Sequence, residues 1–529
     1  MRCPTTVPVL IAGGGPIGLT LSVLLSDLGV DHLLVEARPG TTGHPKSRGI
    51  SARSMEILRR CGLEEEIRAA GLPADQVAFY RGRSLVDPEF TRTSPAGPPS
   101  DGPEHSPTPG LICSQDALEP VLLRRARRAG PDRVRFGTRL LSFTDSTDSA
   151  DPTDGTGSVH AVLADRESGD QFTVRADWLI GCDGAASTVR AGAGLALDGP
   201  TGLRHFLSIR FEAPLGPVVA DRASASYFLT EPGRGGFLAV DNDRQWIYQY
   251  PVGPAGPAAD AEPVELVRAA AGLPGLDVRV RSVQLWRMDA QLASAYRRGR
   301  VLLAGDAAHV IPPTGGHGMN TGIGDVDNLA WKLAAVLGGR AGQALLDSYQ
   351  DERRPVARQV LDRATENAEA RAARGGYRID DELLLTADYR SSAVLADPAD
   401  GPARPLGGSG RPGGAPGQRL PHVRLTGPAE VASSLDLVGP GFALVVEDRE
   451  AVWRAQAADA RAAGIPVAVH RLDPAGPLRE ERPGTWRRLC AVPDGGAVLL
   501  RPDGHIGWRA PGEPAPGELL TVLRRLLSA

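Results

Sequence analysis

The stretch that decides the fold is Val7–Glu36, which reads VPVLIAGGGPIGLTLSVLLSDLGVDHLLVE. Its first part, Val7–Ala12, is mostly apolar and predicts a strand buried in a parallel sheet. Pro16 stands where the first turn of a helix would begin, a position that needs no backbone N–H donor, and the helix is expected to end before Gly29. The apolar run His32–Glu36 predicts a second strand, so the chain opens as a β–α–β unit.

Gly13, Gly15 and Gly18 give this unit the pattern GxGxxG. Such glycines permit a tight turn, a close approach of the backbone to a pyrophosphate, and packing of the helix on the strand. The helix N-terminus then faces the negative phosphates. Glu36 ends the second strand, where an acid is expected to bind ribose hydroxyls. The pattern predicts a dinucleotide site in a Rossmann-like α/β domain, but it does not separate FAD from NAD.

Two further motifs lie far along the chain. CDGAASTVR occupies Cys182–Arg190, and GDAAHVIPPTGGHGMN occupies Gly305–Asn320 after a predicted buried strand at Arg300–Ala304. In this order and with GxGxxG, they resemble the flavin-binding motifs of the FAD-dependent aromatic hydroxylases. That family includes p-hydroxybenzoate hydroxylase and the larger polyketide and phenol hydroxylases. A nicotinamide-dependent dehydrogenase without flavin fits GxGxxG alone, and the third motif argues against it.

The resemblance implies roles for particular residues. Asp306 would bind the ribityl chain, and Asp183 would lie near the pyrophosphate and the path of the nicotinamide. Pro313 would direct its carbonyl to the oxygen-bearing side of the flavin, and a helix starting near Asn320 would point its N-terminus at the flavin pyrimidine. The implied catalytic residues are Pro313 and Arg48, and the implied cofactor-binding residues are Gly13, Gly15, Pro16, Gly18, Glu36, Arg48, Gln115, Asp183, Asp306, Pro313, Gly316, Gly318, Met319 and Asn320.

Other polar residues are not assigned a catalytic role. His317 is interpreted as a loop residue near the flavin, His309 as structural, and the stretch ERRP at Glu352–Pro355 as structural. No substrate-activating base can be assigned. Candidates are Tyr227, Tyr248, Tyr250 and Arg287, although tyrosines at alternating positions more often indicate sheet packing.

The resemblance also implies a reaction. FAD, with NADPH or NADH and O2 as co-substrates, would hydroxylate a polycyclic aromatic, polyketide-type compound through a hydroperoxyflavin. Three alternatives stay open: Baeyer–Villiger oxygen insertion, NADPH-independent oxidation of a biosynthetic intermediate, and a flavin-containing protein that only binds a drug-like ligand. The pattern of motifs does not choose among substrates.

A chain of 529 residues is too long for one core, so several domains are expected. We expect a discontinuous FAD-binding domain (1–78, 110–190 and 290–398), an inserted, mostly β substrate-binding domain (79–109 and 191–289), a linker at 399–417, and a thioredoxin-like α/β domain at 418–529. The last assignment rests on a resemblance of RPDGHIGWR, Arg501–Arg509, to the C-terminal domain of the large hydroxylases. Its predicted strands are Ser434–Val446, Gly464–His470 and Ala497–Arg501, and its predicted helices are Ala451–Ala463 and Gly517–Leu527.

Composition excludes several classes of protein. A formal net charge of −4 offers no basic field for nucleic acid. The uncharged run Val7–Ser26 is broken by glycines and Pro16, so a strand and a buried helix explain it better than a membrane span. The five cysteines form no CxxC pair, which favours a reducing cytoplasm and no disulfide framework or redox centre. No metal site is indicated, and a monomer or homodimer is expected.

Overall fold

The computed structural model describes the chain except residues 1–3, 94–104, 147–156, 232, 259–260, 373–382, 397–399, 408–412, 429–430 and 493. The stretch 93–109, rich in proline, serine and glycine, and the polar stretch 145–157 predict loops, and both lie largely outside the described residues. Among those described, no helix combines the length and the apolar character that crossing a membrane requires.

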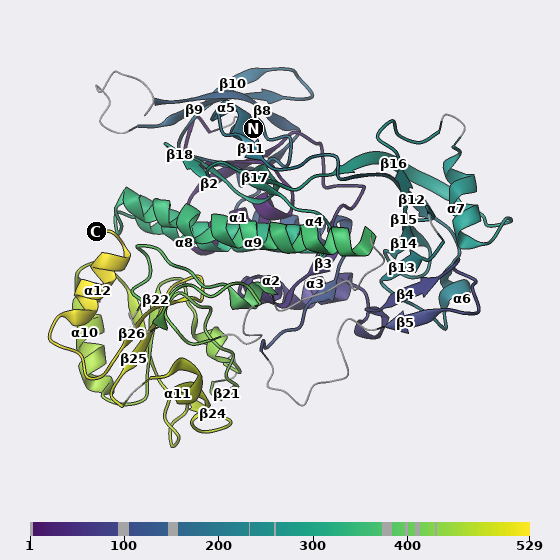
Figure 1. Ribbon diagram of the computed structural model, residues 1–529. Coiled ribbons are helices and arrows are strands. Elements are labelled where there is room, and N and C mark those ends of the chain that lie inside the picture. Colours follow the sequence, from purple (N-terminus) through teal and green to yellow (C-terminus); the bar gives the residue numbers. More distant parts are fainter. Residues whose placement is uncertain are drawn as a thin grey trace.

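An eight-stranded sheet organises the first part of the chain (Figure 1). Its centre has the order β19-β10-β1-β2-β7, and all of these neighbours pair in parallel. The predicted opening strands are confirmed, and both are almost wholly buried. The strands are β1 (Thr6–Ala12), β2 (His32–Glu36), β7 (Val134–Phe136), β8 (Thr138–Asp145), β9 (Val159–Asp165), β10 (Gln171–Gly181), β18 (Arg297–Arg298) and β19 (Val301–Leu303).

Helices cover this sheet. The central one is α8, which starts at Gly318, two residues before the predicted start at Asn320, and is buried along most of its length. Helix α9 runs beside it between the sheet and the C-terminal unit (Figure 1). The helices of this part are α1 (Pro16–Asp27), α2 (Ala52–Arg60), α3 (Glu64–Ala70), α4 (Gln115–Arg128), α5 (Thr188–Gly192), α8 (Gly318–Leu337) and α9 (Asp347–Ala372).

A seven-stranded sheet of order β16-β12-β15-β14-β13-β4-β5 forms the predicted β layer. One face of it packs a closed core under α6 (Gly216–Val219) and α7 (Pro263–Ala271), with Ile209, Trp246 and Tyr248 fully buried. The opposite face is turned toward the first sheet and its helices (Figure 1). The strands are β4 (Phe79–Gly82), β5 (Thr91–Thr93), β12 (Arg204–Glu212), β13 (Ser226–Leu229), β14 (Gly236–Ala239), β15 (Gln245–Val252) and β16 (Arg279–Met288).

Two further sheets are built from short strands. One small sheet has the order β11-β17-β20, and a second pairs β3 with β6. Their strands are β3 (Gly49–Ile50), β6 (Leu111–Ile112), β11 (Leu197–Asp198), β17 (Gln291–Ala293) and β20 (His309–Val310).

The C-terminal unit holds a four-stranded sheet of order β23-β22-β25-β26, in which only β22 and β23 are parallel. The predicted strand from Ser434 is wrong at its start: residues Ser434–Leu437 form a 3-10 turn, because Ser433 and Asp436 cap it reciprocally. The elements are β21 (Leu425–Thr426), β22 (Phe442–Val446), β23 (Val467–Arg471), β24 (Arg479–Glu480), β25 (Ala497–Leu500), β26 (Ile506–Ala510), α10 (Glu450–Ala462), α11 (Thr485–Cys490) and α12 (Glu518–Leu526). The thioredoxin-like class and the domain boundaries stay predictions.

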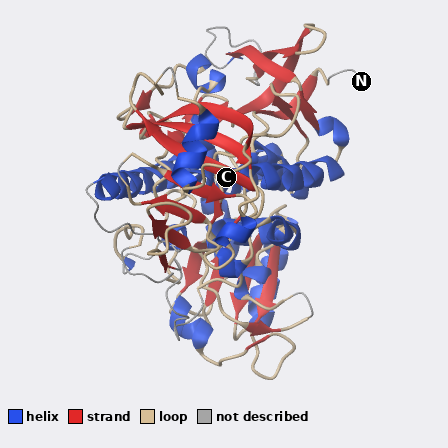
Figure 2. Ribbon diagram, turned by 90° about the vertical axis from the view of Figure 1, so that its right-hand side faces the viewer, coloured by secondary structure: helices blue, strands red, loops and turns tan. Residues whose placement is uncertain are grey.

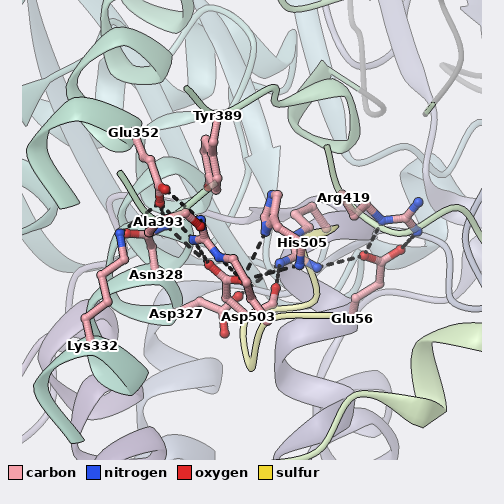
Figure 3. A network of polar contacts seen from close by, with 12 residues as sticks. Glu56, Asp327, Asn328, Lys332, Glu352, Tyr389, Ala393, Arg419, Asp503 and His505 are labelled. Atoms are coloured by element: carbon pink, nitrogen blue, oxygen red, sulfur yellow. Dashed lines mark hydrogen bonds and ion pairs between the residues drawn. The ribbon is translucent and has the colours of Figure 1, made fainter. Parts of the chain in front are cut away.

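Buried charged side chains join this unit to α2, α8 and α9 (Figure 3). Arg53 of α2 donates to Asp327 of α8 at 2.9 Å and to the carbonyl of Asp503 at 2.8 Å. Arg419 pairs with Glu56 of α2. In a view turned by 90°, helices lie between the strands of the upper and lower parts of the molecule (Figure 2). Because buried charges are stable only when paired, this network fixes the unit against the helices.

Candidate active site

Four motif segments meet at one edge of the first sheet. Strands β2, β1, β10 and β19 are adjacent and parallel. Strand β2 ends at Glu36, and the other three end shortly before Gly13, Asp183 and Asp306. Backbone hydrogen bonds continue across them past the strand ends, from Gly13 N to Val35 O at 2.8 Å and from Cys182 N to Ala12 O at 2.8 Å. Ligands of open α/β sheets bind at the carboxyl ends of the strands, so this edge is the candidate site.

Each glycine of the first motif has its own physical reason. Gly13 has a φ of +111°, and a Cβ there would lie 2.3 Å from the carbonyl oxygen of Cys182. A Cβ on Gly18 would lie 2.0 Å from the carbonyl oxygen of Gly13. At Gly15 a Cβ would meet no protein atom within 4 Å, and no side chain caps the N-terminus of α1. Gly13 and Gly18 are needed because a side chain there would overlap backbone atoms. Gly15 instead borders open space and free N–H groups suited to an anion.

Glu36 is held beside the glycine turn. Its Oε2 accepts a hydrogen bond from Gly14 N at 2.7 Å, and its Oε1 accepts one from the Arg38 side chain at 3.0 Å. Burial alone would raise the pKa of Glu36, but the hydrogen bonds from Arg38 and Gly14 outweigh it and lower the pKa. The residue is therefore an ionised acceptor at neutral pH, as a ribose-binding acid must be.

The second motif connects the first and third motifs. Asp183 accepts hydrogen bonds from Ser187 Oγ and, at 3.1 Å, from Val189 N at the start of α5, while burial raises the pKa of its carboxyl. Arg190 donates to the carbonyl of Ala307 in the third motif at 3.1 Å. The DG turn thus lies against Gly13 on one side and against the GDAAH segment on the other.

The third motif forms a loop and then the start of α8. Asp306 is exposed to solvent, yet the surrounding protein raises the pKa of its carboxyl by desolvation. Gly316 has a φ of +73° with no atom within 4 Å of a built Cβ. Asn320 donates to the carbonyls of Gly316 at 2.7 Å and Gly49 at 3.0 Å, so it joins this loop to the segment containing Arg48.

The remaining predicted residues fall around these. Pro313 is exposed, and its carbonyl accepts Gly316 N at 3.1 Å. Met319 is buried. The side chain of Gln115 accepts a hydrogen bond from Lys46 N at 3.2 Å and donates one to Glu119 at 2.8 Å. Nothing in these contacts tests their predicted contacts with the cofactor, which stay predictions.

The site's features fit FAD. An uncapped helix, an open glycine turn and an ionised acid at the end of β2 are what an adenine dinucleotide requires. Helix α8 adds a second N-terminus without a side-chain cap, next to the Gly315–Gly316 turn. This positive end suits the electron-rich ring of a flavin.

Comparison with known proteins agrees with this geometry. Residues 6–364 match the family model described as an FAD binding domain, and residues 413–529 match the aromatic-ring hydroxylase C-terminal domain. The chain belongs to the FAD-dependent aromatic-ring hydroxylases. The predicted α/β fold with an FAD-binding domain, the cofactor FAD and the enzyme class are confirmed for this hydroxylase.

Its relatives cover the whole chain. Tetracenomycin B2 monooxygenase-dioxygenase from Streptomyces olivaceus is 38% identical, over 99% of either chain. The flavin-dependent monooxygenase PieE, solved with FAD and substrate, superposes with a TM-score of 0.88 at 33% identity. Aklavinone-11 hydroxylase, solved with FAD and aklavinone, superposes with a TM-score of 0.86 at 35% identity. Both structural matches cover 100% of this chain and of the other.

In the hydroxylase, Arg48 reaches from the cofactor edge to the seven-stranded sheet. It donates to the carbonyls of Ala225 and Ala239 at 2.8 Å each and to Ser226 Oγ at 3.0 Å. These neutral partners do not offset burial, which lowers the pKa of Arg48 to about 10. Arg48 is thus a bridge between the two layers, and its predicted contact with the flavin is untested.

The tyrosines considered as a base are packing residues on the closed side of this sheet. Tyr227 donates to Asn242 Oδ1 at 2.8 Å and Tyr248 donates to the carbonyl of Arg234 at 2.5 Å. Desolvation raises the pKa of both phenols. Arg287 is exposed and paired with Asp289. The interpretation as sheet packing fits both buried tyrosines.

Sequence reasoning missed the support beneath the third motif. Asp325 of α8 accepts Gly305 N at 3.1 Å, His309 Nε2 at 2.7 Å and Arg353 Nε at 2.9 Å. Burial would raise the pKa of Asp325, but His309 and Arg353 lower it. The sequence did carry a signal for this support, because an acidic residue inside an apolar helix must be buried together with polar partners. His309 and Arg353 are structural, in agreement with their interpretation.

Proposed function

We propose that this hydroxylase inserts one oxygen atom from O2 into a polycyclic aromatic, polyketide-type substrate, with NADPH or NADH as the reductant. FAD, when bound, carries the electrons from the nicotinamide to O2 and delivers the oxygen atom. The protein supplies position, exclusion of water and control of protons.

The observation that carries the substrate class is the open face of the seven-stranded sheet. Phe79, Phe206, Phe228 and Trp286 are only half-buried there, in contrast with the closed core on the opposite face. Arg48 donates to Ser226 Oγ of this sheet and so connects it to the edge of the first sheet where the motifs meet. Large apolar rings with a few directed polar groups are typical of sites for small aromatic ligands. The hydroxylase that superposes at 35% identity was solved with aklavinone, which supports a polycyclic ligand here.

The residues that would hold FAD follow from the geometry. The N–H groups at the start of α1, next to Gly15 and Pro16, would bind the pyrophosphate, and Glu36 would accept from the ribose hydroxyls. Asp306 would accept from the ribityl chain, and the first turn of α8 at Gly318–Asn320 would direct its N–H groups at the pyrimidine. Asn320 would keep that turn in register with the Arg48 segment through its bonds to Gly49 and Gly316.

The decisive experiment follows NADPH and NADH oxidation by the FAD-loaded protein with a panel of polycyclic phenols and quinones under 18O2. Substrate-stimulated oxidation and a product that gains one labelled oxygen atom are expected. A ring-opened or lactone product would instead favour Baeyer–Villiger insertion. Bound flavin that is never reduced by either nicotinamide, with or without ligand, would contradict the proposal.

A further inference from the structure

A chain of hydrogen bonds crosses the open face of the seven-stranded sheet. Trp286 Nε1 donates to Gln249 Oε1 at 2.8 Å, and Gln249 Nε2 donates to Ser208 Oγ at 2.9 Å. Ser208 Oγ lies 2.8 Å from His44 Nε2, and His44 Nδ1 lies 2.7 Å from Ser282 Oγ. The chain therefore connects three neighbouring strands, β15, β12 and β16, with the loop that follows Glu36.

The direction of this chain is set at its tryptophan. An indole N–H can only donate, so the atom of the Gln249 amide that faces Trp286 must be the carbonyl oxygen. The amide nitrogen then points the other way, toward Ser208. Whereas a glutamine amide can usually be assigned in either orientation, the fixed donor of Trp286 removes this ambiguity here.

The far end of the chain agrees with this direction. Ser208 is 2% exposed, accepts from Gln249, and has no acceptor for its own proton other than His44 Nε2 among the described residues. His44 Nε2 is therefore the unprotonated nitrogen, and the proton sits on Nδ1, which donates to Ser282.

The charges around His44 favour its neutral form. Desolvation lowers the pKa of His44, and Arg210 on β12 and Lys46 on its own loop lower it further, while Asp116 of α4 opposes them. Arg210 and Asp116 are themselves paired at 2.6 Å. The imidazole thus stays an acceptor at Nε2 at neutral pH, and the whole chain keeps one polarity.

Gln249 has one donor left. Its Nε2 carries two hydrogens, only one of which is used by Ser208, and the second forms no hydrogen bond within the part of the chain that the structure describes. The side chain is half-buried. Next to it, the rings of Phe206 and Trp286 stack with centroids 4.7 Å apart and planes 14° apart. A directed N–H donor therefore lies at the side of a flat aromatic stack.

We propose that Gln249 is a specificity-determining residue, whose free Nε2–H binds a hydroxyl or carbonyl oxygen of a polycyclic substrate lying against the Phe206–Trp286 stack. Trp286 positions the donor by holding the amide oxygen. This inference rests on the proposed function, because it assumes that the open face of the sheet receives the aromatic substrate.

The test measures binding to the FAD-loaded protein by equilibrium dialysis, with 1,8-dihydroxyanthraquinone and anthracene as probes. Gln249→Glu keeps the shape but replaces the donor with an acceptor, so the dihydroxyanthraquinone is expected to bind about tenfold more weakly. Anthracene binding should change less than about twofold, because no hydrogen bond is lost. The matched control is Gln284→Glu, since Gln284 lies on the same face, directly across from Ser208, outside the chain of bonds.

The possible outcomes distinguish failure of the inference from failure of the proposed function. If Gln284→Glu weakens the dihydroxyanthraquinone as much as Gln249→Glu does, negative charge rather than a lost donor is responsible, and the inference is wrong. If wild type binds neither probe, the proposed polycyclic substrate class fails. If it binds both and Gln249→Glu binds the dihydroxyanthraquinone normally, only the inference fails.

A second variant tests the inference even if Gln249→Glu does not fold. Trp286→Phe keeps an aromatic ring but removes the N–H that orients the amide, so the preference for the oxygenated probe over anthracene should fall while bound FAD is retained. An unchanged preference would contradict the positioning role of Trp286.

Discussion

Glu352 of helix α9 and Arg501 of the C-terminal unit form a two-point ion pair, with N–O distances of 2.6 and 2.8 Å, and neither side chain is exposed to solvent. Lys332 of α8 donates to the same carboxylate at 2.8 Å, and Arg501 also pairs with Asp503. The C-terminal unit is therefore attached to the two helices that support the flavin motif. Removing one partner leaves buried charge uncompensated, which costs more than the pair itself contributes.

The first prediction concerns this pair. Glu352→Gln keeps the volume but leaves Arg501 and Lys332 short of a counter-charge, so the free energy of unfolding should fall by about 3–5 kcal/mol in denaturant titrations. Glu513→Gln is the control, because Glu513 is 53% exposed and 3.7 Å from Arg449. That surface variant should change stability by less than about 1 kcal/mol. Equal effects of the two variants would show that the buried network does not anchor the unit.

The second prediction separates folding from cofactor binding at the glycine turn. Gly15→Ala meets no protein atom, so the apoprotein should unfold at the wild-type denaturant concentration. FAD should bind at least about tenfold more weakly, because the methyl group occupies the space through which the pyrophosphate approaches the backbone. Flavin fluorescence titration measures this affinity.

Gly13→Ala should behave differently, because its Cβ would overlap the carbonyl of Cys182 and its φ is positive. We expect destabilisation of the apoprotein as well as loss of FAD. Gly439→Ala, which also meets no atom within 4 Å, is the control and should bind FAD normally. If Gly15→Ala bound FAD as tightly as the control does, the pyrophosphate would not lie at this turn.

The third prediction is a pH dependence of stability. His32 is 2% exposed, and desolvation lowers its pKa below 6.5, although its hydrogen bond to the carbonyl of Val30 opposes this. The unfolded chain therefore binds a proton near pH 6.5 that the folded chain does not bind until lower pH. Wild type should lose stability relative to His32→Gln as the pH falls below 6.5, with a slope of at most about 1.4 kcal/mol per pH unit. Unfolding titrations at pH 7.5 and 5.0 measure it, and a constant difference between the two proteins would contradict it.

Local patterns in the chain predicted the elements that each motif needs. The glycine turn, Glu36 and the uncapped start of α1 could be inferred because strand, turn and helix are consecutive in the sequence. The segment Ser434–Leu437 misled, because its alternating SLDL pattern is typical of a strand, whereas the capping box of Ser433 and Asp436 decides the local structure.

Contacts between distant segments could not be predicted in the same way. The reason that Gly13 must be glycine is the backbone of Cys182, and the partner of Glu352 is Arg501, in a different unit. The hydrogen-bond chain through His44, Ser208 and Gln249 depends on strand register, which a single sequence does not specify. The motifs therefore pointed to the cofactor, while the open face that we propose to receive the substrate became visible only in the structure.

The last prediction concerns the support of the GDAAH segment. Asp325 is fully buried, and its carboxylate accepts from Gly305 N, His309 and Arg353 at once. Asp325→Asn keeps the shape, but its amide nitrogen can no longer accept, and Arg353 loses its counter-charge. Stability should fall by about 3–5 kcal/mol. FAD affinity should fall too, because Gly305 immediately precedes Asp306 and moves with it.

Tyr389→Phe is the matched control, since it removes a second side-chain partner of Arg353, a hydroxyl at 2.9 Å, without touching Gly305. It should cost about 1 kcal/mol of stability and leave FAD affinity unchanged. FAD titrations of both variants, at a temperature where each is folded, separate the two effects. If Asp325→Asn loses stability but binds FAD as tightly as Tyr389→Phe does, Asp325 supports only the fold, and the position of Asp306 does not depend on it.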